Sequence, residues 1–383
     1  MHHQLSKWRR TVAAVLLASG AAVAAPAVAT AHPSRGEFVY VNDNTAGANT
    51  VAAFVRHPDG GLTPVPGSPF NAGGAGSGTG LASQGAIQVS SDDRYVLAVD
   101  AGSDQISVLR IGRDGALELV PGGVVPSGGA EPVSVAEHDG LVYVANAGAA
   151  GSNYTGFTLT DGGHLHPLAG STVPLPASAQ PGDVLFNPTG TSLVGTRVGT
   201  SQVDSFRVSS DGRLIAAPGS PFAAQGAGPF GSEFRPTNAS QLFVSNAHNA
   251  AGDGTVSAFR VARDGTLSSI GSSPFADQQT APCWVEISHD GEFLFTVNTG
   301  SGDISRYWIA PDGALTLLGS TPVSAQAGVG AVDARLSTNG QTLYVDESRV
   351  DAVGVFAVDG GHLTEQSTVT LPAGATPAGV AVS

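Results

Sequence analysis

The sequence contains few of the residues on which several common classes of protein depend. It has a single cysteine, Cys283, which excludes an internal disulfide and any cysteine-rich metal site. Only 13% of the residues are charged, whereas 52 of the 383 residues are glycine and 24 are proline. This composition excludes long amphipathic helices and coiled coils, which need charged surfaces and few helix-breaking residues. The net charge of −14 argues against nucleic acid or an anionic membrane as a partner, because both bind basic surfaces.

The first 31 residues have the pattern of a secretory signal peptide. Lys7, Arg9 and Arg10 precede a run of Ala, Val and Leu, and small residues follow up to Ala31. We therefore expect export, cleavage after Ala31 and a secreted, extracellular protein that begins at His32. The arginine pair leaves twin-arginine export open, whereas glycine and proline within the run argue against a transmembrane anchor. N-terminal sequencing of the exported protein checks this prediction, and an intact leader would contradict it.

Lysine is almost absent from the chain. Lys7 is the only one, and cleavage of the leader removes it together with two arginines and no acidic residue. The mature chain then carries 14 basic and 31 acidic residues, and it cannot use a Schiff-base lysine or a P-loop lysine. Its histidines are scattered over the loops, except for His164 and His166, whose i, i+2 spacing is typical of a strand. We predict neither a metal ion nor a cofactor.

A repeat of about 50 residues organises the rest of the chain. Each repeat contains an Asp-Gly turn that is followed within two residues by Leu or His-Leu. The aspartates of the seven turns are Asp59, Asp114, Asp161, Asp211, Asp264, Asp312 and Asp359. Their spacings lie between 47 and 55 residues, so the repeat persists through the whole mature chain.

Alternating apolar residues indicate four short strands in each repeat. In the sixth repeat they are 282–288, 293–298 ending in Asn, a third strand before the turn, and 315–318 after it. Such period-two patterning is typical of half-buried strands. Four strands repeated seven times predict an all-β, seven-bladed β-propeller with four antiparallel strands per blade.

The two ends of the repeated region complement each other. Residues 377–383 have the pattern of a first strand, whereas the other end starts directly with a second strand at Phe38. We therefore expect the C-terminal strand to pair with three N-terminal strands and close the ring, which removes exposed sheet edges. The propeller is predicted to span 38–383, after a short lead at 32–37. A pair of β-sandwiches is the alternative, although no linker or change of composition marks a domain boundary.

Three short motifs recur in the repeats. They are Pro-x-x-Val-x-x-Ser-x-Asp-Gly, a strand that ends in Asn or Asp, and Asp-Gly-x-Leu followed by Gly-Ser-Pro-Phe, as at 67–70 and 219–222. In these recurring motifs the chain resembles the lactonase-type seven-bladed propellers, a group that includes 6-phosphogluconolactonase and the carboxymuconate lactonizing enzyme. The resemblance covers 38–383. It implies a lactone hydrolase or a lactonizing, cyclase-type enzyme, with a lactone or a carboxylated cyclic molecule as substrate.

The resemblance also implies where catalytic groups would lie. Active members of the family carry His or Arg just after the proline that opens certain inner strands, and an acid after a second strand. The positions equivalent to the first kind are occupied here by Gly85, Val133, Gly182, Phe230, Cys283 and Ala378, and Thr299 stands in place of the acid. None of these side chains can pair bidentately with a carboxylate or act as a general base near neutral pH. We therefore expect ordinary sugar-lactone hydrolysis to be slow or absent.

Other polar residues are candidates for an unconventional site. Residues of this kind on the predicted inner strands are Gln88, Asp183, Glu233, Glu286, Asp333 and Arg335. A buried carboxylate is costly unless it is paired, so we expect some of them to line a water-filled central channel. Arg197 breaks the Asn/Asp pattern at the end of a second strand and is a candidate anion contact. We predict catalytic roles for Arg197, Glu233, Glu286 and Arg335, and ligand-binding roles for Asp183, His248, Trp284 and Asp333.

Two functional classes remain open at this point. The first is an enzyme that acts on a lactone through these residues. The second is a non-enzymatic extracellular module that uses the rim and channel of the propeller to bind a small molecule, a saccharide or a protein. A purely structural role for the inner-strand acids, in which they hydrate the channel or pair with Arg335, also stays open. We expect a monomer with no membrane span after cleavage.

Overall fold

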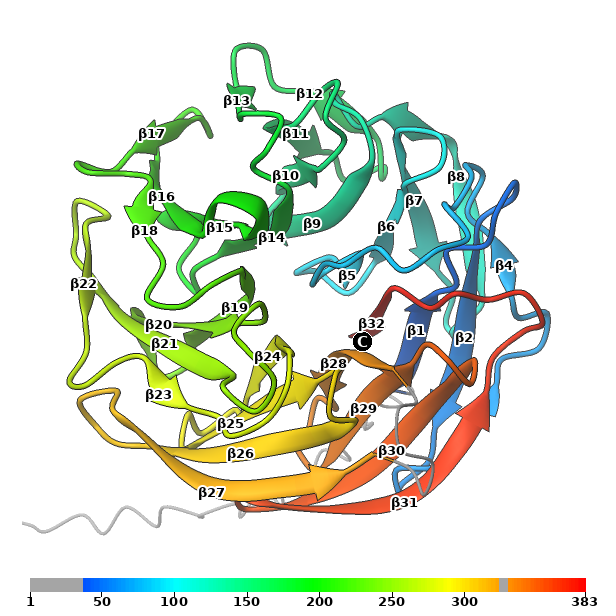
Figure 1. The fold of residues 1–383 in the computed structure, drawn as a ribbon. Helices are drawn as coiled ribbons and strands as arrows, with labels where there is room; N and C mark the ends of the chain where they lie inside the picture. The colour runs from blue at the N-terminus through cyan, green and yellow to red at the C-terminus, as the bar shows by residue number, and fades with distance from the viewer. Residues whose placement is uncertain (1–36, 324–329) are drawn as a thin grey trace, which may run out of the picture. The chain divides into compact units, whose positions relative to one another are not determined.

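The computed structural model describes residues 37–323 and 330–383, so the predicted signal peptide lies outside the described residues. The unit Gly36–Ser383 contains, in its described part, seven antiparallel sheets and one short 3-10 turn, Val198–Thr200. Figure 1 shows these sheets as blades around a common centre. The prediction of a seven-bladed propeller with four strands per blade is confirmed. No helix among the described residues has the length and hydropathy needed to span a bilayer.

Each blade has an inner, a second, a third and an outer strand. The inner strands are β32 (Gly379–Val382), β5 (Ile87–Val89), β9 (Pro132–His138), β14 (Pro181–Phe186), β19 (Pro229–Arg235), β24 (Pro282–Ile287) and β28 (Ala331–Leu336). The second strands are β1 (Phe38–Asn42), β6 (Tyr95–Asp100), β10 (Leu141–Asn146), β15 (Ser192–Arg197), β20 (Asn238–Asn246), β25 (Phe293–Asn298) and β29 (Thr342–Glu347). We number the blades 1 to 7 in this order.

The other strands complete the blades in the same order. The third strands are β2 (Thr50–Arg56), β7 (Gln105–Ile111), β11 (Asn153–Leu159), β16 (Gln202–Val208), β21 (Thr255–Val261), β26 (Asp303–Ile309) and β30 (Ala352–Asp359). The outer strands are β3 (Leu62–Pro64), β8 (Leu117–Pro126), β12 (Leu165–Pro167), β17 (Leu214–Ala216), β22 (Leu267–Ser269), β27 (Leu315–Pro322) and β31 (His362–Thr370). Short extra strands on the third strands of four blades are β4 (Phe70–Asn71), β13 (Val173–Pro174), β18 (Phe222–Ala223) and β23 (Phe275–Ala276).

The hydrophobic core lies in the seams between blades. In β6, Val96 and Ala98 pack into a cluster with blade 1, whereas Leu97 and Val99 pack into a cluster with blade 3. Successive side chains of a strand point to opposite faces, so one apolar strand supplies both seams. This explains why the second strands are apolar along nearly their whole length, and why every residue of β6 is buried.

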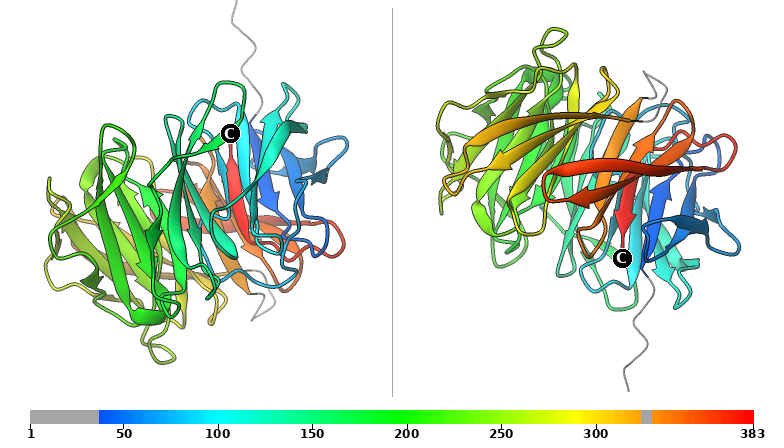
Figure 2. Two further views of the ribbon diagram at one scale, coloured as in Figure 1. Left: turned by 90° about the horizontal axis from the view of Figure 1, so that it is seen from above. Right: turned by 90° about the horizontal axis from the view of Figure 1, so that it is seen from below.

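The C-terminal strand closes the ring as predicted. β32 pairs antiparallel with β1, with Val380 opposite Val41 and Ala381 opposite Tyr40. Val380 is fully buried, and Val382 is partly buried against the same apolar cluster. In both views of Figure 2 the red C-terminal strand lies beside the blue N-terminal strands. Blade 1 is therefore built from both ends of the described chain.

Candidate functional site

A loop between blades 1 and 2 reaches the centre of the ring. We call residues 80–85 the crossing segment; it precedes β5, which Figure 1 shows near the centre. Ser83 Oγ donates a hydrogen bond to the carbonyl oxygen of Val133 in blade 3 at 2.7 Å. Its own carbonyl accepts a hydrogen bond from Trp284 Nε1 in blade 6, also at 2.7 Å. The crossing segment is therefore tied to blades on both sides of the channel.

Gln84 hydrogen-bonds to residues up to 201 positions away in the sequence, in blades 5 and 6. Its amide Nε2 donates to the carbonyl oxygens of Ser232 at 3.1 Å and Val285 at 3.2 Å, and its Oε1 accepts from the Val285 backbone N–H at 3.0 Å. Its backbone N–H donates to Gly182 O at 2.9 Å. A Cβ at Gly231 would lie 2.0 Å from Gln84 Oε1, so this inner strand needs glycine to admit the side chain. Both polar atoms of the Gln84 side-chain amide are therefore hydrogen-bonded, Nε2 as a donor and Oε1 as an acceptor. These bonds fix the side chain across the channel, and we call it the Gln84 partition.

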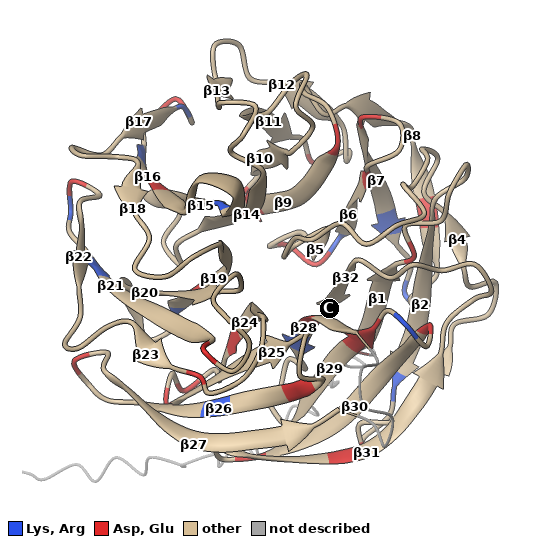
Figure 3. Cartoon of the chain, viewed as in Figure 1, with Lys and Arg blue, Asp and Glu red and all other residues tan. Residues whose placement is uncertain are grey.

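Three of the four predicted catalytic residues meet on the inner strands. Arg335 Nη1 of β28 lies 3.2 Å from Glu286 Oε2 of β24 and 3.9 Å from Glu233 Oε2 of β19. Glu286 Oε1 also accepts the Leu336 backbone N–H at 3.0 Å. The side chains keep contact with solvent, with exposed fractions of 31% for Arg335, 18% for Glu233 and 8% for Glu286. Figure 3 shows an acidic segment at β24 and a basic one at β28 close to the ring centre.

Two further acids lie behind this group. Asp183 Oδ2 accepts hydrogen bonds from Ser232 N at 3.0 Å and Ser232 Oγ at 2.5 Å, and Asp183 Oδ1 accepts from Ser134 Oγ at 3.3 Å. Asp333 Oδ1 accepts from the Ala334 N–H at 2.9 Å, and its Oδ2 accepts from the Val380 N–H at 3.3 Å. Both carboxyls are almost fully buried. Asp333 thereby also connects β28 to the closing strand.

Burial shifts the proton affinity of this group upward. It raises the pKa of Asp183 and the pKa of Asp333 to about 7 in each case. Burial and then the charge of Glu286 raise the pKa of Glu233. The charge of Glu286, followed by those of other acids, raises the pKa of Arg335, which therefore stays cationic. The group thus combines a permanent cation with carboxyls that keep a proton at a pH where ordinary carboxyls have lost it.

Asp183, Glu233 and Arg335 of this group border a cavity of about 300 Å³, which we call the acidic cavity. The residues that line it are Gln84, Gly85, Ile87, Gln88, Val89, Val135, Asp183, Val184, Leu185, Glu233, Arg335, Ala381 and Val382. They come from six of the seven inner strands and from the crossing segment. The lining combines carboxyl, amide and guanidinium groups with aliphatic side chains, as small-molecule sites commonly do.

Arg197 does not join this group. Its Nε and Nη2 donate to Asp204 Oδ2 and Oδ1 at 2.6 and 2.7 Å, and its side chain is only 11% exposed. Asp204 Oδ2 also accepts a hydrogen bond from the buried Tyr154 hydroxyl at 3.1 Å. No hydrogen bond or ion pair between described residues connects Arg197 to Arg335 or its carboxylate partners. The structure therefore gives this guanidinium a bidentate partner inside blade 4.

Trp284 and His248 lie on the other side of the crossing segment. Trp284 lines a cavity of about 270 Å³, which we call the tryptophan cavity. His248 lines a separate cavity of about 240 Å³ together with Glu131 and Gln180. Both cavities also border the crossing segment and Phe230, near the beginnings of the inner strands. Of the four predicted ligand-binding residues, only Asp183 lines the acidic cavity, and Asp333 lies behind it, bonded to Ala334 and Val380.

The crossing segment is the part of the site that sequence reasoning missed. Every contact of Gln84 described above joins it to a residue far away in the chain, and no local pattern encodes such contacts. The sequence offered only an unspecific signal, because a proline begins four of the seven inner strands and is missing at the start of β5, β28 and β32 alike. Among the described residues, no group of three or more His, Cys, Asp and Glu side chains is arranged to hold a metal ion.

Comparisons with known proteins agree with this architecture. Residues 233–381 match the family model described as "Lactonase, 7-bladed beta-propeller". A Bacteroides uniformis structure provisionally described as a 6-phosphogluconolactonase is 20% identical, with a TM-score of 0.73 over 91% of this chain and 100% of that one. The periplasmic gluconolactonase PpgL of Pseudomonas aeruginosa is 18% identical, with a TM-score of 0.71 over 90% of this chain and 98% of that one. A search of curated proteins found no significant match. At these identities the solved structures establish the fold alone, and the resemblance to lactonase-type propellers is confirmed.

Proposed function

Because the chain is a propeller that resembles the lactonases, we propose that it is an exported enzyme that hydrolyses an uncharged lactone in its acidic cavity. The observation that carries the proposal is the convergence of Glu233 and Arg335 at a cavity of about 300 Å³, with Glu286 paired to Arg335 beside it. Hydrolysis of a lactone needs a group that moves a proton and a donor that stabilises the oxyanion. Glu233 and Arg335 supply these two functions from the inner strands of blades 5 and 7.

The reaction uses the three side chains in different ways. A water molecule attacks the lactone carbonyl carbon, and Glu233 accepts a proton from that water when it is in its ionised form, whose share grows as the pH approaches its raised pKa. The guanidinium of Arg335 donates hydrogen bonds to the carbonyl oxygen as it becomes an oxyanion. The ring C–O bond then breaks, and Glu233 returns the proton to the departing alkoxide. Glu286 forms an ion pair with the Arg335 guanidinium at 3.2 Å and so helps to fix its orientation.

The charge of the cavity favours a neutral substrate. Four carboxyls, those of Asp183, Glu233, Glu286 and Asp333, surround one guanidinium among the described residues of this group. Arg335 is already paired with Glu286, so a phosphate or carboxylate on the substrate would find no unpaired cation within this group to bind it. Aliphatic residues such as Leu185 also line the cavity. A lactone with an apolar ring substituent therefore fits this lining better than a phosphorylated sugar lactone.

We expect wild-type protein to open uncharged alkyl lactones faster than glucono-δ-lactone, and 6-phosphogluconolactone most slowly. Substitution Arg335→Gln removes the oxyanion donor and should lower kcat by about 10²–10³-fold. Substitution Glu233→Gln removes the proton carrier and should lower kcat by about 10²–10⁴-fold. Proton release in weakly buffered solution, with the spontaneous rate subtracted, measures each rate.

The exposed Arg263, on a turn of blade 5, gives the matched control. Arg263→Gln changes the net charge by the same amount as Arg335→Gln, and it should leave turnover unchanged. Turnover that survives both Arg335→Gln and Glu233→Gln would place the reaction elsewhere. Absence of turnover on the whole panel would remove the enzymatic proposal and leave a binding module as the alternative.

A further inference from the structure

The seam between blades 7 and 1 contains buried carboxyls as well as apolar side chains. Tyr344 of β29 packs there in one cluster with Val41 of β1. Successive side chains of a strand alternate between its two faces, so Asp346, two residues after Tyr344, faces the same seam. Asp43, two residues after Val41, faces it from blade 1, because its backbone N–H continues the strand pairing by donating to Thr50 O at 3.0 Å.

These two carboxyls lack the partners that buried carboxyls normally have. Both residues are fully buried. Neither carboxyl oxygen of Asp346 has a hydrogen-bond partner, and Asp43 Oδ1 has none either, whereas Asp43 Oδ2 accepts from Thr50 Oγ1 at 2.7 Å. None of the ion pairs between described residues includes either side chain. Three oxygen atoms are therefore left unbonded in an apolar seam, which is costly.

A bound cation would satisfy this arrangement more fully than protonation. Burial, followed by the charges of other acids, Asp333 and Asp43 first, raises the pKa of Asp346 well above the ordinary value. A proton would remove the charge of the carboxyl, but it would leave oxygen atoms of the seam without a hydrogen-bond partner. A cation between the two carboxylates would both cancel their repulsion and bind their free oxygens.

The type of ligand atom selects the class of cation. Carboxylate oxygens are hard ligands that suit Ca²⁺ and Mg²⁺ better than softer transition metals. Mg²⁺ usually retains several waters, for which a buried seam has little room, whereas Ca²⁺ accepts about six to eight oxygens in flexible arrangements. No group of three or more His, Cys, Asp and Glu side chains is arranged for a metal ion in the described part of the chain. The other ligands would therefore be main-chain carbonyls, hydroxyls and water, which Ca²⁺ also accepts.

We propose that the seam between blades 7 and 1 binds a Ca²⁺ ion between the carboxylates of Asp43 and Asp346. This replaces the expectation from the sequence that the chain binds no metal ion. The ion connects the second strands of the last and first blades, next to the closing strand β32, whose Val380 belongs to the same cluster. The proposal does not depend on lactone hydrolysis, because neither carboxyl lines the acidic cavity.

Refolding with and without calcium tests the site. Because the carboxyls are enclosed, the protein is unfolded in urea and refolded at pH 8 in CaCl₂, in MgCl₂ or in EDTA. A concentration of about 5 mM exceeds the Kd of even weak extracellular Ca²⁺ modules. The midpoint of thermal unfolding should be several degrees higher in CaCl₂ than in EDTA, and MgCl₂ should give little of this shift. Equilibrium dialysis should find one bound Ca²⁺ per chain.

Variants of the two carboxyls assign the effect to the seam. Asp346→Asn and Asp43→Asn should each raise the Kd for Ca²⁺ at least about tenfold and remove most of the thermal shift. In EDTA, Asp346→Asn should be at least as stable as wild type, because it removes a buried charge. This measurement separates loss of the site from damage to the fold.

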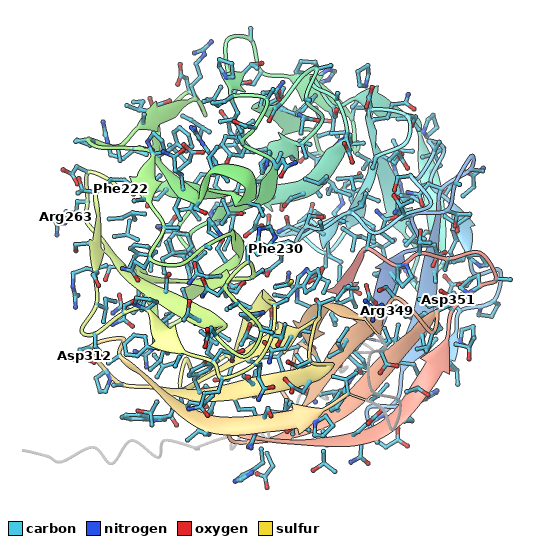
Figure 4. All side chains as sticks on the ribbon, in the orientation of Figure 1. Phe222, Phe230, Arg263, Asp312, Arg349 and Asp351 are labelled. Atoms are coloured by element: carbon cyan, nitrogen blue, oxygen red, sulfur yellow. The ribbon has the colours of Figure 1, made fainter. Side chains whose placement is uncertain are left out.

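Asp312→Asn is the matched control, because it removes one carboxylate from an exposed turn of blade 6. Figure 4 shows Asp312 at the edge of the ring, on the opposite side of the view from Asp351 of blade 7. This variant should respond to Ca²⁺ as wild type does. The proposal is overturned if refolding in CaCl₂ and in EDTA gives the same midpoint, if Asp346→Asn keeps the full shift, or if MgCl₂ matches CaCl₂.

Discussion

Deletion of residues 377–383 is expected to lower the midpoint of thermal unfolding strongly or to make the protein aggregate. The deletion removes β32 and its pairing with β1, including the fully buried Val380. Each buried apolar side chain contributes roughly 1.5–3 kcal/mol, in a fold whose net stability is about 5–15 kcal/mol. It also exposes β1 as an unprotected sheet edge, which favours aggregation. Calorimetry and light scattering measure the two effects.

The side chains of β32 provide a graded version of this experiment. Val380→Ala creates a cavity in the seam between blades 7 and 1 and should cost clearly more stability than Val382→Ala, because Val382 is only partly buried. An unchanged melting temperature and solubility after the deletion would contradict the closure of the ring.

Stability is expected to be greatest in mild acid and to fall as the pH rises toward 8. Burial raises the pKa values of Asp43, Asp183 and Asp333 to about 7, whereas an aspartate in the unfolded chain titrates near about 3.9. Between these values the folded state binds more protons than the unfolded state. The free energy of unfolding therefore decreases with pH over this interval and levels off above the folded-state pKa.

Urea unfolding at pH 5, 6, 7 and 8 measures this dependence. We expect the free energy of unfolding to decrease by several kcal/mol in total, since one unit of pKa shift corresponds to about 1.4 kcal/mol for each group. Below about pH 4 the trend should reverse, because ion pairs such as Arg197–Asp204 lose their carboxylate. A free energy of unfolding that rises from pH 5 to pH 8 would show that these carboxyls are ionised and well solvated in the folded state.

Asp346 allows a specific test of the same idea. It is the last but one residue of β29, is fully buried, and neither of its carboxyl oxygens has a hydrogen-bond partner among the described residues. Burial, followed by the charges of Asp333 and Asp43, raises its pKa well above the ordinary value. Asp346→Asn should therefore stabilise the protein at pH 8 and reduce the slope of stability against pH. Asp139→Asn, at a side chain that is 83% exposed, should change neither.

The fold could be predicted from the sequence because its signals are local and repeated. Asp-Gly turns such as Asp264-Gly265 mark one hairpin in each blade, and the alternation within strands such as β6 reports burial directly. The closure of the ring could be inferred because the first strand missing at one end stands at the other. None of these inferences required knowledge of which blade faces which across the ring.

The site was only partly predictable, because its contacts join residues that lie far apart in the sequence and do not repeat from blade to blade. Glu233, Glu286 and Arg335 stood out as charged residues in apolar strands, and the circular order of the blades brings them together. Arg197 stood out by the same rule, but the register of β15 with β16 brings it to Asp204, and the sequence does not show which of these partners a charged side chain reaches. Gln84 carried no signal of its role, because its partners lie 148 and 201 residues away.

The hydrogen bonds of Gln84 across the channel affect how cooperatively the propeller unfolds. In an array where each repeat contacts only its neighbours, unfolding can start at the weakest junction and spread from repeat to repeat. Ser83 and Gln84 instead connect a loop before blade 2 to blades 5 and 6, which are not its neighbours around the ring. Loss of blade 5 or blade 6 therefore also breaks bonds to a segment on another side of the ring. We therefore expect the inner strands joined by these bonds to unfold together as one cooperative unit, and the outer strands to fray separately.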